Sequence, residues 1–271
     1  MPELPEVETT LRGIQPHIEN QRILKINIYN ASLRWPIDLS IVETLKNQQL
    51  LQIFRRGKYL ILQFKKGALL LHLGMSGSLR VLDRDDELQK HDHFEIVFKN
   101  KKALRLRDPR RFGSVLWTTE PWQKHKLINK LGPEPLTSDF DESILFQQSR
   151  KKTVAIKSFI MNSHIVVGVG NIYASESLFL AGINPNKAAG KVSKKRYEAL
   201  TQAIKTILSK AIKQGGTTLK DFSSPDGSPG YFAQQLNVYG RKSEPCPACE
   251  KPITQKVINQ RATYYCTYCQ K

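Results

Sequence analysis

Apolar and polar residues alternate in short runs along the first 119 positions of the chain. Eight runs have the residue pattern of β-strands: 23–31, 49–56, 58–64, 68–73, 78–83, 93–99, 103–108 and 113–119. Turn segments such as "KKG", "DRDD" and "KNKK" separate several of them. Eight short strands at this spacing predict a β-sandwich or a barrel. Ahead of them, Val7, Leu11 and Ile14 recur at helical spacing after Pro5, so a helix should flank the strands.

Helical periodicity takes over after "LGPEPLTSDFD". The predicted helices cover 143–152, 154–162, 172–183 and 193–214, and the last one stops at Gly215 and Gly216. "SSPDGSPG" at 223–230 has loop composition, and a cysteine module follows from about Asn237. We therefore predict an α+β multidomain protein. Residues 1–131 form a β-sandwich domain with a flanking helix, 132–223 form a helical domain, and 224–271 hold the end of the loop and a metal-bound β-hairpin.

The charge of the chain points to a polyanionic partner. Its 42 Lys and Arg residues against 24 Asp and Glu residues give a net charge of +18, spread over most of the chain. Nucleic acid is the commonest partner of such a protein, although charge can also serve only to keep a protein soluble. No apolar run approaches the roughly 20 residues of a membrane helix. The acidic N-terminus lacks the features of a signal peptide, so we expect a cytoplasmic protein with no membrane partner.

All four cysteines lie in the last 26 residues, in "CPAC" and "CTYC", with 16 residues between the two pairs. A disulfide framework would be spread through the fold. Two C-x2-C pairs joined by a segment long enough for a hairpin favour one closed, structural Zn²⁺ site over free thiols or an iron–sulfur centre. The expected ligands are Cys246, Cys249, Cys266 and Cys269. Arg261 lies between the pairs, either displayed by the hairpin or simply an exposed arginine.

Pro2 stands one residue from the start of the chain, in "MPELPEVET". Removal of Met1 is favoured when the second residue is small, and it would leave Pro2 as a secondary amine. An α-amino group titrates near pH 8, so a useful fraction is unprotonated at neutral pH. Attack by this amine on a sugar C1′ would give an iminium ion, an electron sink for elimination of phosphates. Glu3 could donate a proton beside it. Alternatively, Pro2 only shapes the terminus.

Nine motifs in order decide between these alternatives: "PELPEVET", "RRGKYL", "HLGMSGSL", "KHDH", "DPRRFG", "GVGNIYASE", "GGTTLKDF", "NVYGRK" and the cysteine module. Together they resemble the bacterial formamidopyrimidine-DNA glycosylase family, also called 8-oxoguanine DNA glycosylases, over essentially the whole chain. The resemblance implies a DNA repair glycosylase and AP lyase that excises oxidised purines from duplex DNA through a Schiff base and then cleaves the strand by β,δ-elimination. It also implies a helix–two-turn–helix motif in the helical domain and a structural zinc ion.

The resemblance implies four catalytic residues. Pro2 is the nucleophile and Glu3 is the acid. Lys58, in "RRGKYL", would hold a phosphate and donate a proton during elimination; a surface lysine is the less favoured alternative. Arg261 would clamp phosphates and assist the second elimination.

Further residues match positions that contact DNA in the family. Met75 and Phe112 would be apolar wedges that fill the gap left by the extruded base, unless they pack in a core. Arg110 would pair with the orphaned cytosine, and Asn171 would grip phosphates. Other expected DNA contacts are Lys151, His91, His72 and Tyr239, of which the two histidines could also be purely structural. "TTLKDFSSPDGSPGY" matches the loop that closes over the flipped base.

Two other functions remain open from the sequence. The sister family of endonuclease VIII removes oxidised pyrimidines with the same proline nucleophile, but its opening usually lacks the "ELPEVET" form and its gap-filling residues differ. A non-catalytic zinc DNA-binding protein on the same scaffold would not need Pro2, Glu3 and Lys58 together. We expect one chain to act alone as a monomer.

Overall fold

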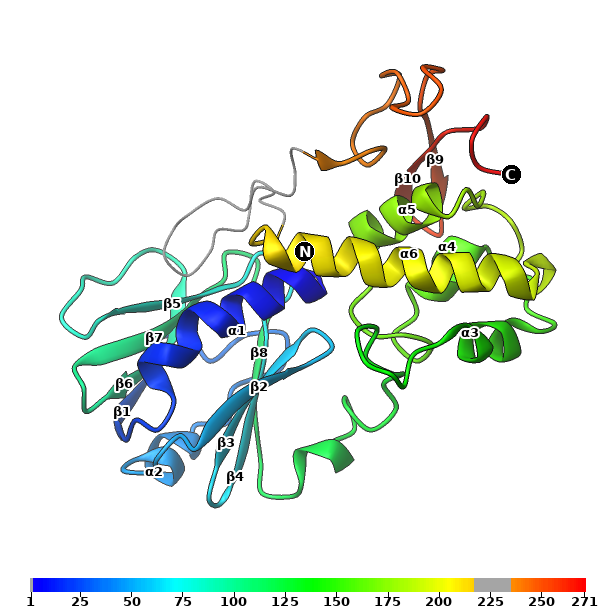
Figure 1. Ribbon diagram of the computed structural model, residues 1–271. Helices are drawn as coiled ribbons and strands as arrows, with labels where there is room; N and C mark the ends of the chain where they lie inside the picture. Colours follow the sequence, from blue (N-terminus) through cyan, green and yellow to red (C-terminus); the bar gives the residue numbers. More distant parts are fainter. Residues whose placement is uncertain (1, 217–234) are drawn as a thin grey trace. The chain divides into compact units, whose positions relative to one another are not determined.

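The computed structural model describes residues 2–216 and 235–271 (Figure 1). Contacts divide the described residues into two compact units. The first contains residues 2–129 together with Gly215 and Gly216, and the second contains residues 130–214 and 235–271. The segment "TTLKDFSSPDGSPGY", expected to close over a flipped base, lies outside the described residues, as does Met1.

The first unit is a β-sandwich, as predicted. All eight expected strands form, and their neighbours in each sheet are antiparallel. One sheet has the order β1-β6-β7-β5 and the other β2-β3-β4-β8. The strands are β1 (Ile23–Ile28), β2 (Gln52–Arg56), β3 (Tyr59–Phe64), β4 (Gly67–His72), β5 (Ser78–Asp83), β6 (Asp92–Phe98), β7 (Lys102–Arg107) and β8 (Ser114–Thr118). A short helix α2 (Ile41–Leu45) and a 3-10 turn η1 (Trp122–Lys124), neither of them predicted, complete the unit.

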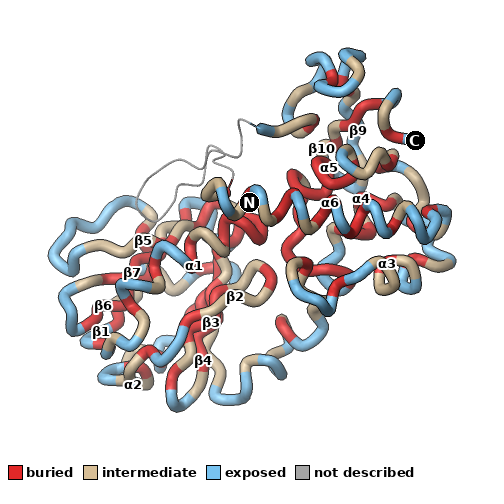
Figure 2. The backbone as a smooth tube through the Cα atoms, viewed as in Figure 1, coloured by how far each residue is buried: buried red, intermediate tan, exposed pale blue. Residues whose placement is uncertain are grey.

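Alternate side chains of both sheets meet in one apolar core. Figure 2 shows buried stretches along the strands of this unit, among them β6, which is buried throughout. Each fully buried aliphatic or aromatic side chain contributes roughly 1.5–3 kcal/mol relative to exposure. Cross-strand partners in this core are Leu60 with Leu71, Leu62 with Leu69, Phe94 with Leu106 and Ile96 with Leu104.

The opposite face of β6 and β7 buries charge. Arg105 is 1% exposed and faces Glu95 across the two strands, with 2.6 Å between its Nη2 and Glu95 Oε2. Its guanidinium also donates to the backbone carbonyls of Asp86 and Glu87, so the loop after β5 covers this face. The alternation of apolar and polar residues along β6 and β7 does not predict the ion pair of Arg105 with Glu95. Asp92, next to His91, lies 3.5 Å from Arg105 Nη1 and also pairs with Arg80 at 2.6 Å.

Helix α1 (Leu4–Ile18) contacts strands of both sheets. Its buried apolar residues follow the 3–4 spacing of an amphipathic helix: Leu4, Val7, Leu11, Ile14 and Ile18. Pro5 in the first turn needs no backbone hydrogen-bond donor, and Pro16 lies in the last turn, where the helix ends.

The second unit contains four α-helices within the described residues: α3 (Glu142–Ser149), α4 (Ile156–Ile160), α5 (Asn171–Leu180) and α6 (Lys194–Lys213). A 3-10 turn η2 (Ala189–Lys191) precedes α6. Asp141 caps α3 by accepting from the Ile144 N–H, and Ser193 caps α6 by accepting from the Arg196 N–H. Helix α6 ends before Gly215, whose φ is +74°, as the sequence predicted. Helix α4 is shorter than the predicted 154–162.

The cysteine module forms the predicted hairpin, β9 (Thr254–Ile258) and β10 (Arg261–Tyr265). Asn259 and Gln260 form the two-residue turn, and both have positive φ, as tight hairpins require. A small core of Val238, Cys246, Ile253 and Cys266 supports the module. No helix in the described ranges is both long and apolar enough to cross a lipid bilayer.

Candidate functional site

The start of the chain is fixed by the first turn of α1. Pro2 is buried, and Glu3 is 2% exposed at the N-cap position. Glu3 and Glu6 form a reciprocal capping box, in which the Glu3 N–H donates to Glu6 Oε2 at 2.8 Å. Gly216, with φ +78°, lies against Glu6, because a Cβ there would be 3.1 Å from Glu6 Oε1. Residues 2 and 3 are therefore held in place, although chain ends are usually poorly ordered.

A salt bridge links α1 to the turn that carries Lys58. Arg55 Nε lies 2.9 Å from Glu8 Oε2 on α1, and Arg55 Nη1 donates to the Gly57 carbonyl at 3.0 Å. Burial alone would raise the pKa of Glu8, but hydrogen bonds and charge from Arg55 and Arg12 lower it below its usual value. The ionised Glu8 therefore fixes the position of the β2–β3 turn, in which Lys58 follows Gly57 directly.

His72 is partly buried at the end of β4, opposite Tyr59 on β3. Its Nδ1 accepts a hydrogen bond from the Gly74 N–H at 3.0 Å, so the ring proton of neutral His72 is on Nε2. Burial lowers the pKa of His72 to about 4, helped by the charges of Lys58 and Arg34. His72 is therefore neutral at pH 7. A neutral imidazole could still donate one hydrogen bond from Nε2, so the predicted DNA contact stays a prediction.

The loops holding Met75, Arg110 and Phe112 touch each other. A Cβ on Gly74 would be 2.4 Å from the Phe112 carbonyl carbon, so only glycine fits there. Phe112 is 44% exposed, and the Arg110 guanidinium lies 4.9 Å from its ring centroid. Met75 is half-buried. Phe112 is therefore not a core residue, which removes the alternative that the sequence left open for it.

Two predicted contact residues, and one residue between two others, adopt left-handed backbone conformations. His91 has φ +76°, Lys151 has φ +61°, and Arg111, between Arg110 and Phe112, has φ +56°. Such conformations cost free energy for residues with a side chain and persist where the surrounding structure imposes them. They concentrate at functional sites, which supports the prediction for these loops without testing it.

In the second unit, Asn171 and Tyr239 come together with the zinc hairpin. Asn171 is the first residue of α5, and its Nδ2 donates to the Ala262 carbonyl at 3.1 Å and to the Tyr239 hydroxyl at 3.3 Å. Arg261, next to Ala262, is exposed at the start of β10. Two predicted contact residues, Asn171 and Tyr239, thus lie beside the strand that begins with the predicted catalytic Arg261.

Two buried charged residues that the sequence analysis missed organise this region. Glu176 is 0% exposed, and its carboxylate accepts four hydrogen bonds of 2.9 Å from Asn237, Val238 and Tyr239. Lys157 on α4 is 1% exposed, and its Nζ donates to the Ala262 carbonyl at 3.1 Å and to Thr263 Oγ1 at 2.8 Å. A charge inside an otherwise apolar helix, as in "YASESLFL" and "VAIKSFI", is the signal that could have identified them.

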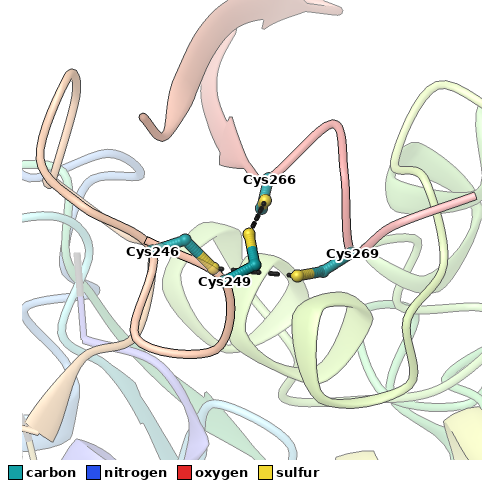
Figure 3. Close-up of side chains that lie close together, drawn as sticks. All are labelled: Cys246, Cys249, Cys266 and Cys269. Carbon is teal, nitrogen blue, oxygen red and sulfur yellow. Dashed lines mark hydrogen bonds between the residues drawn. The ribbon is translucent and has the colours of Figure 1, made fainter. Parts of the chain in front are cut away.

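The four cysteine sulfurs form a cluster in which all lie within 4.8 Å of one another (Figure 3). Sγ of Cys246 and Cys269 are 3.9 Å apart, and Sγ of Cys249 and Cys266 are 3.4 Å apart. Tetrahedral zinc with Zn–S bonds of about 2.3 Å needs sulfurs separated by roughly 3.8 Å, so these thiols fit one zinc ion. Four ligands leave no open position, so the ion is structural, as the spacing predicted.

The first prediction concerns His72. Because its pKa is depressed from 6.5 to about 4 in the folded state, its contribution to stability is complete above pH 6.5 and is lost as the pH falls toward 4. His72→Asn keeps an acceptor for the Gly74 N–H but does not titrate. Between pH 7 and pH 5 the wild type should lose roughly 1–2 kcal/mol more unfolding free energy than this variant. Denaturant titrations at both pH values measure it, and equal losses would contradict the assignment.

The second prediction concerns the metal. The wild type should bind one zinc ion per chain, measured by metal analysis after dialysis. Cys249→Ser should bind zinc much more weakly, and hydrogen exchange of the β9 and β10 amides should accelerate. Thr267→Ala changes an exposed residue between two ligands and serves as the control. Wild-type zinc affinity in Cys249→Ser would contradict the four-thiolate site.

Comparisons with known proteins agree with this arrangement. The formamidopyrimidine-DNA glycosylase N-terminal domain matches residues 1–115, and the H2TH domain of the same family matches residues 131–223. A zinc finger found in FPG and IleRS matches residues 243–271.

Full-length relatives and solved structures give the same result. The formamidopyrimidine-DNA glycosylase of Saccharophagus degradans is 55% identical, with 100% of both chains covered. That of Hydrogenovibrio crunogenus is 57% identical over 100% of this chain and 97% of its own. The MutM (Fpg) protein of Thermus thermophilus superposes with a TM-score of 0.89 at 33% identity, covering 99% and 98% of the two chains. A complex of Lactococcus lactis Fpg with DNA containing an abasic site gives 0.92 at 34% identity, covering 99% of each. The predicted family is confirmed: the chain belongs to the formamidopyrimidine-DNA glycosylase family.

Proposed function

We propose that this protein is a bifunctional DNA glycosylase and AP lyase that removes oxidised purines, such as 8-oxoguanine and formamidopyrimidines, from duplex DNA. The observation that carries the proposal is a buried Pro2, held by a capped helix at the one place where a proline nitrogen can be a nucleophile. Relatives named formamidopyrimidine-DNA glycosylase match the full chain, and a similar Lactococcus lactis structure holds DNA that contains Fapy-dG.

The chemistry begins with the Pro2 amine after Met1 is removed. Its lone pair forms a bond to C1′ while the bond from C1′ to the damaged base breaks, and the proton that the Pro2 nitrogen loses balances the proton that the departing base takes up. Glu3 donates a proton to the sugar ring oxygen, the C1′–O4′ bond opens, and a C1′=N⁺ iminium remains. The capping box supports this role, because it fixes the Glu3 carboxyl one residue from the nucleophile.

The iminium then accepts the electrons of two eliminations. Loss of a C2′ proton expels the 3′ phosphate, and loss of a second sugar proton expels the 5′ phosphate. We assign Lys58 to phosphate binding and proton transfer in the first elimination and Arg261 to the second. The Glu8–Arg55–Gly57 link supports the role of Lys58, and the tight two-residue turn that precedes Arg261 supports the role of Arg261.

We propose that Met75, Arg110 and Phe112 fill the gap left by the extruded base. The exposure of Phe112 and the stacking of the Arg110 guanidinium over its ring support this assignment. Arg110 presents paired donors to the O2 and N3 acceptors of cytosine, whereas adenine presents a donor on its pairing edge. Excision of 8-oxoguanine opposite a wrongly inserted adenine would make the mutation permanent, so a preference for cytosine has a biological reason. The residues that we assign to the remaining DNA contacts are His72, His91, Lys151, Asn171 and Tyr239.

No observation favours the other two functions considered from the sequence. Removal of oxidised pyrimidines would imply relatives in the sister family, but the full-length relatives carry the purine-lesion name. A non-catalytic protein has no need for a buried Pro2 next to a capped helix start. The named relatives are bacterial, and we place the enzyme in the cytoplasm, where it would act on the nucleoid as a monomer. We keep 1–131, 132–223 and 224–271 as its functional divisions.

The third prediction tests the nucleophile. Borohydride should reduce the iminium and join the mature protein covalently to DNA that contains 8-oxoguanine. A preparation that retains Met1 has an amide nitrogen at Pro2 and should give no cross-link, although it should bind DNA. Pro2→Gly keeps a primary amine and should retain weak cross-linking. Normal cross-linking by protein whose Met1 is verified by mass would show that Pro2 is not the nucleophile.

The fourth prediction separates base reading from phosphate binding. Arg110→Ala should lose most of the preference for cytosine over adenine opposite the lesion, an effect of roughly 1–3 kcal/mol. Lys151→Ala should instead weaken binding to all duplexes about equally and reduce the salt slope by roughly 1. Affinities for the four opposite bases at several salt concentrations measure both effects. Full cytosine preference in Arg110→Ala would reduce Arg110 to a phosphate anchor.

A further inference from the structure

We infer that Asp108 and Ser76 form a buried link that positions the Met75 loop and the Arg110–Phe112 loop as one unit. Through that link they control which opposite base is accepted. This inference rests on the proposed function, since it assigns positioning residues to the reading of the opposite base. Neither residue is proposed to touch DNA.

The link is a chain of hydrogen bonds through two buried side chains. Asp108 is 0% exposed and Ser76 is 6% exposed. The Ser76 hydroxyl donates to Asp108 Oδ1 at 2.8 Å and accepts from the Arg110 N–H at 3.2 Å. Asp108 Oδ2 accepts from the Gly113 N–H at 2.7 Å. Ser76, next to Met75, therefore holds Arg110, the first residue of the Arg110–Phe112 segment. The Asp108 carboxylate holds Gly113, the residue that follows this segment.

Asp108 is itself fixed. The Nε2 of His93, a 6% exposed residue, lies 2.9 Å from the Asp108 carbonyl oxygen and must be the donor, because a carbonyl can only accept. The Asp108 N–H donates to the His91 carbonyl at 3.0 Å. A Cβ on Gly113 would be 3.0 Å from Asp108 Oδ2 and 2.8 Å from the His72 carbonyl, so the loop has no room to shift inward.

The exposed side chains depend on this backbone. Arg110 and Phe112 project from a three-residue segment that turns through the left-handed Arg111 and is hydrogen-bonded at both ends. Reading a base requires donors placed to within about 0.5 Å, and rigid support supplies that precision. A hydrogen bond to a buried carboxylate is also stronger than one between neutral groups. The arrangement of Asp108 and Ser76 suits positioning rather than direct contact.

The test uses Ser76→Ala, which removes the hydroxyl and leaves Asp108 bound to Gly113. The ratio of excision rates opposite cytosine and adenine should fall about 3- to 10-fold, the effect of one lost hydrogen bond. In the free protein, the Arg110 amide should exchange faster with solvent. Borohydride trapping on DNA that already contains an abasic site opposite cytosine should still occur, because Pro2 and Glu3 are unchanged in this variant. Ser76→Thr restores a hydroxyl and should recover the ratio.

Ser114→Ala is the matched control, since the Ser114 hydroxyl is buried at the start of β8 and has no hydrogen-bond partner within the part of the chain that is described. Asp108→Asn is the second variant, because an amide has only one acceptor oxygen and cannot accept at both the Ser76 and the Gly113 positions, so it should lower the ratio further. A wild-type ratio in Ser76→Ala and Asp108→Asn, with faster exchange of the Arg110 amide, would overturn the inference. If the wild type itself forms no trapped complex, the proposed function fails instead, and unchanged amide exchange in Ser76→Ala would then reject the link separately.

Discussion

A proline nitrogen can attack a sugar only at the end of a chain, and that constraint governs the first unit. The end of a chain is normally its least ordered part, whereas a nucleophile must be held within a fraction of an ångström of its target. The reciprocal capping of Glu3 and Glu6 meets this requirement, because Pro2, the first residue of the mature sequence, is the neighbour of the helix N-cap Glu3. Burial of Leu4, Val7 and Leu11 then fixes the helix on the sandwich.

Other parts of the candidate site are fixed by single carboxylates that are buried or partly buried. Glu8 holds Arg55 and the Lys58 turn, Asp108 holds the reading loops, and Glu176 holds residues 237–239. Each carboxylate accepts hydrogen bonds from donors on another segment, which costs little once the segments are packed and is expensive to break. The exposed side chains of Arg110 and Phe112 therefore project from a backbone that cannot easily move.

Local patterns were enough to predict the eight strands, the last long helix and the zinc ligands. Alternation, helix caps and the C-x2-C spacing are properties of neighbouring residues, and they survive in any context. The buried ion pair of Glu95 with Arg105 and the contact of Lys157 with β10 were not predicted, because their partners are 10 and 105 or more residues apart. Helix α2 was missed because it has only five residues, too few for a periodic signal. The catalytic residues came from resemblance to a family, since no local rule singles out Pro2.

The position of the covalent bond tests the central claim most directly. Protein reduced with borohydride on DNA containing 8-oxoguanine can be digested with nuclease and trypsin, and the peptides sequenced by mass spectrometry. Cleavage after Arg12 releases residues 2–12 as one peptide that contains no lysine. Our account predicts the reduced sugar remnant on the nitrogen of Pro2 in this peptide. A remnant on a lysine, such as Lys58 or Lys157, would contradict it.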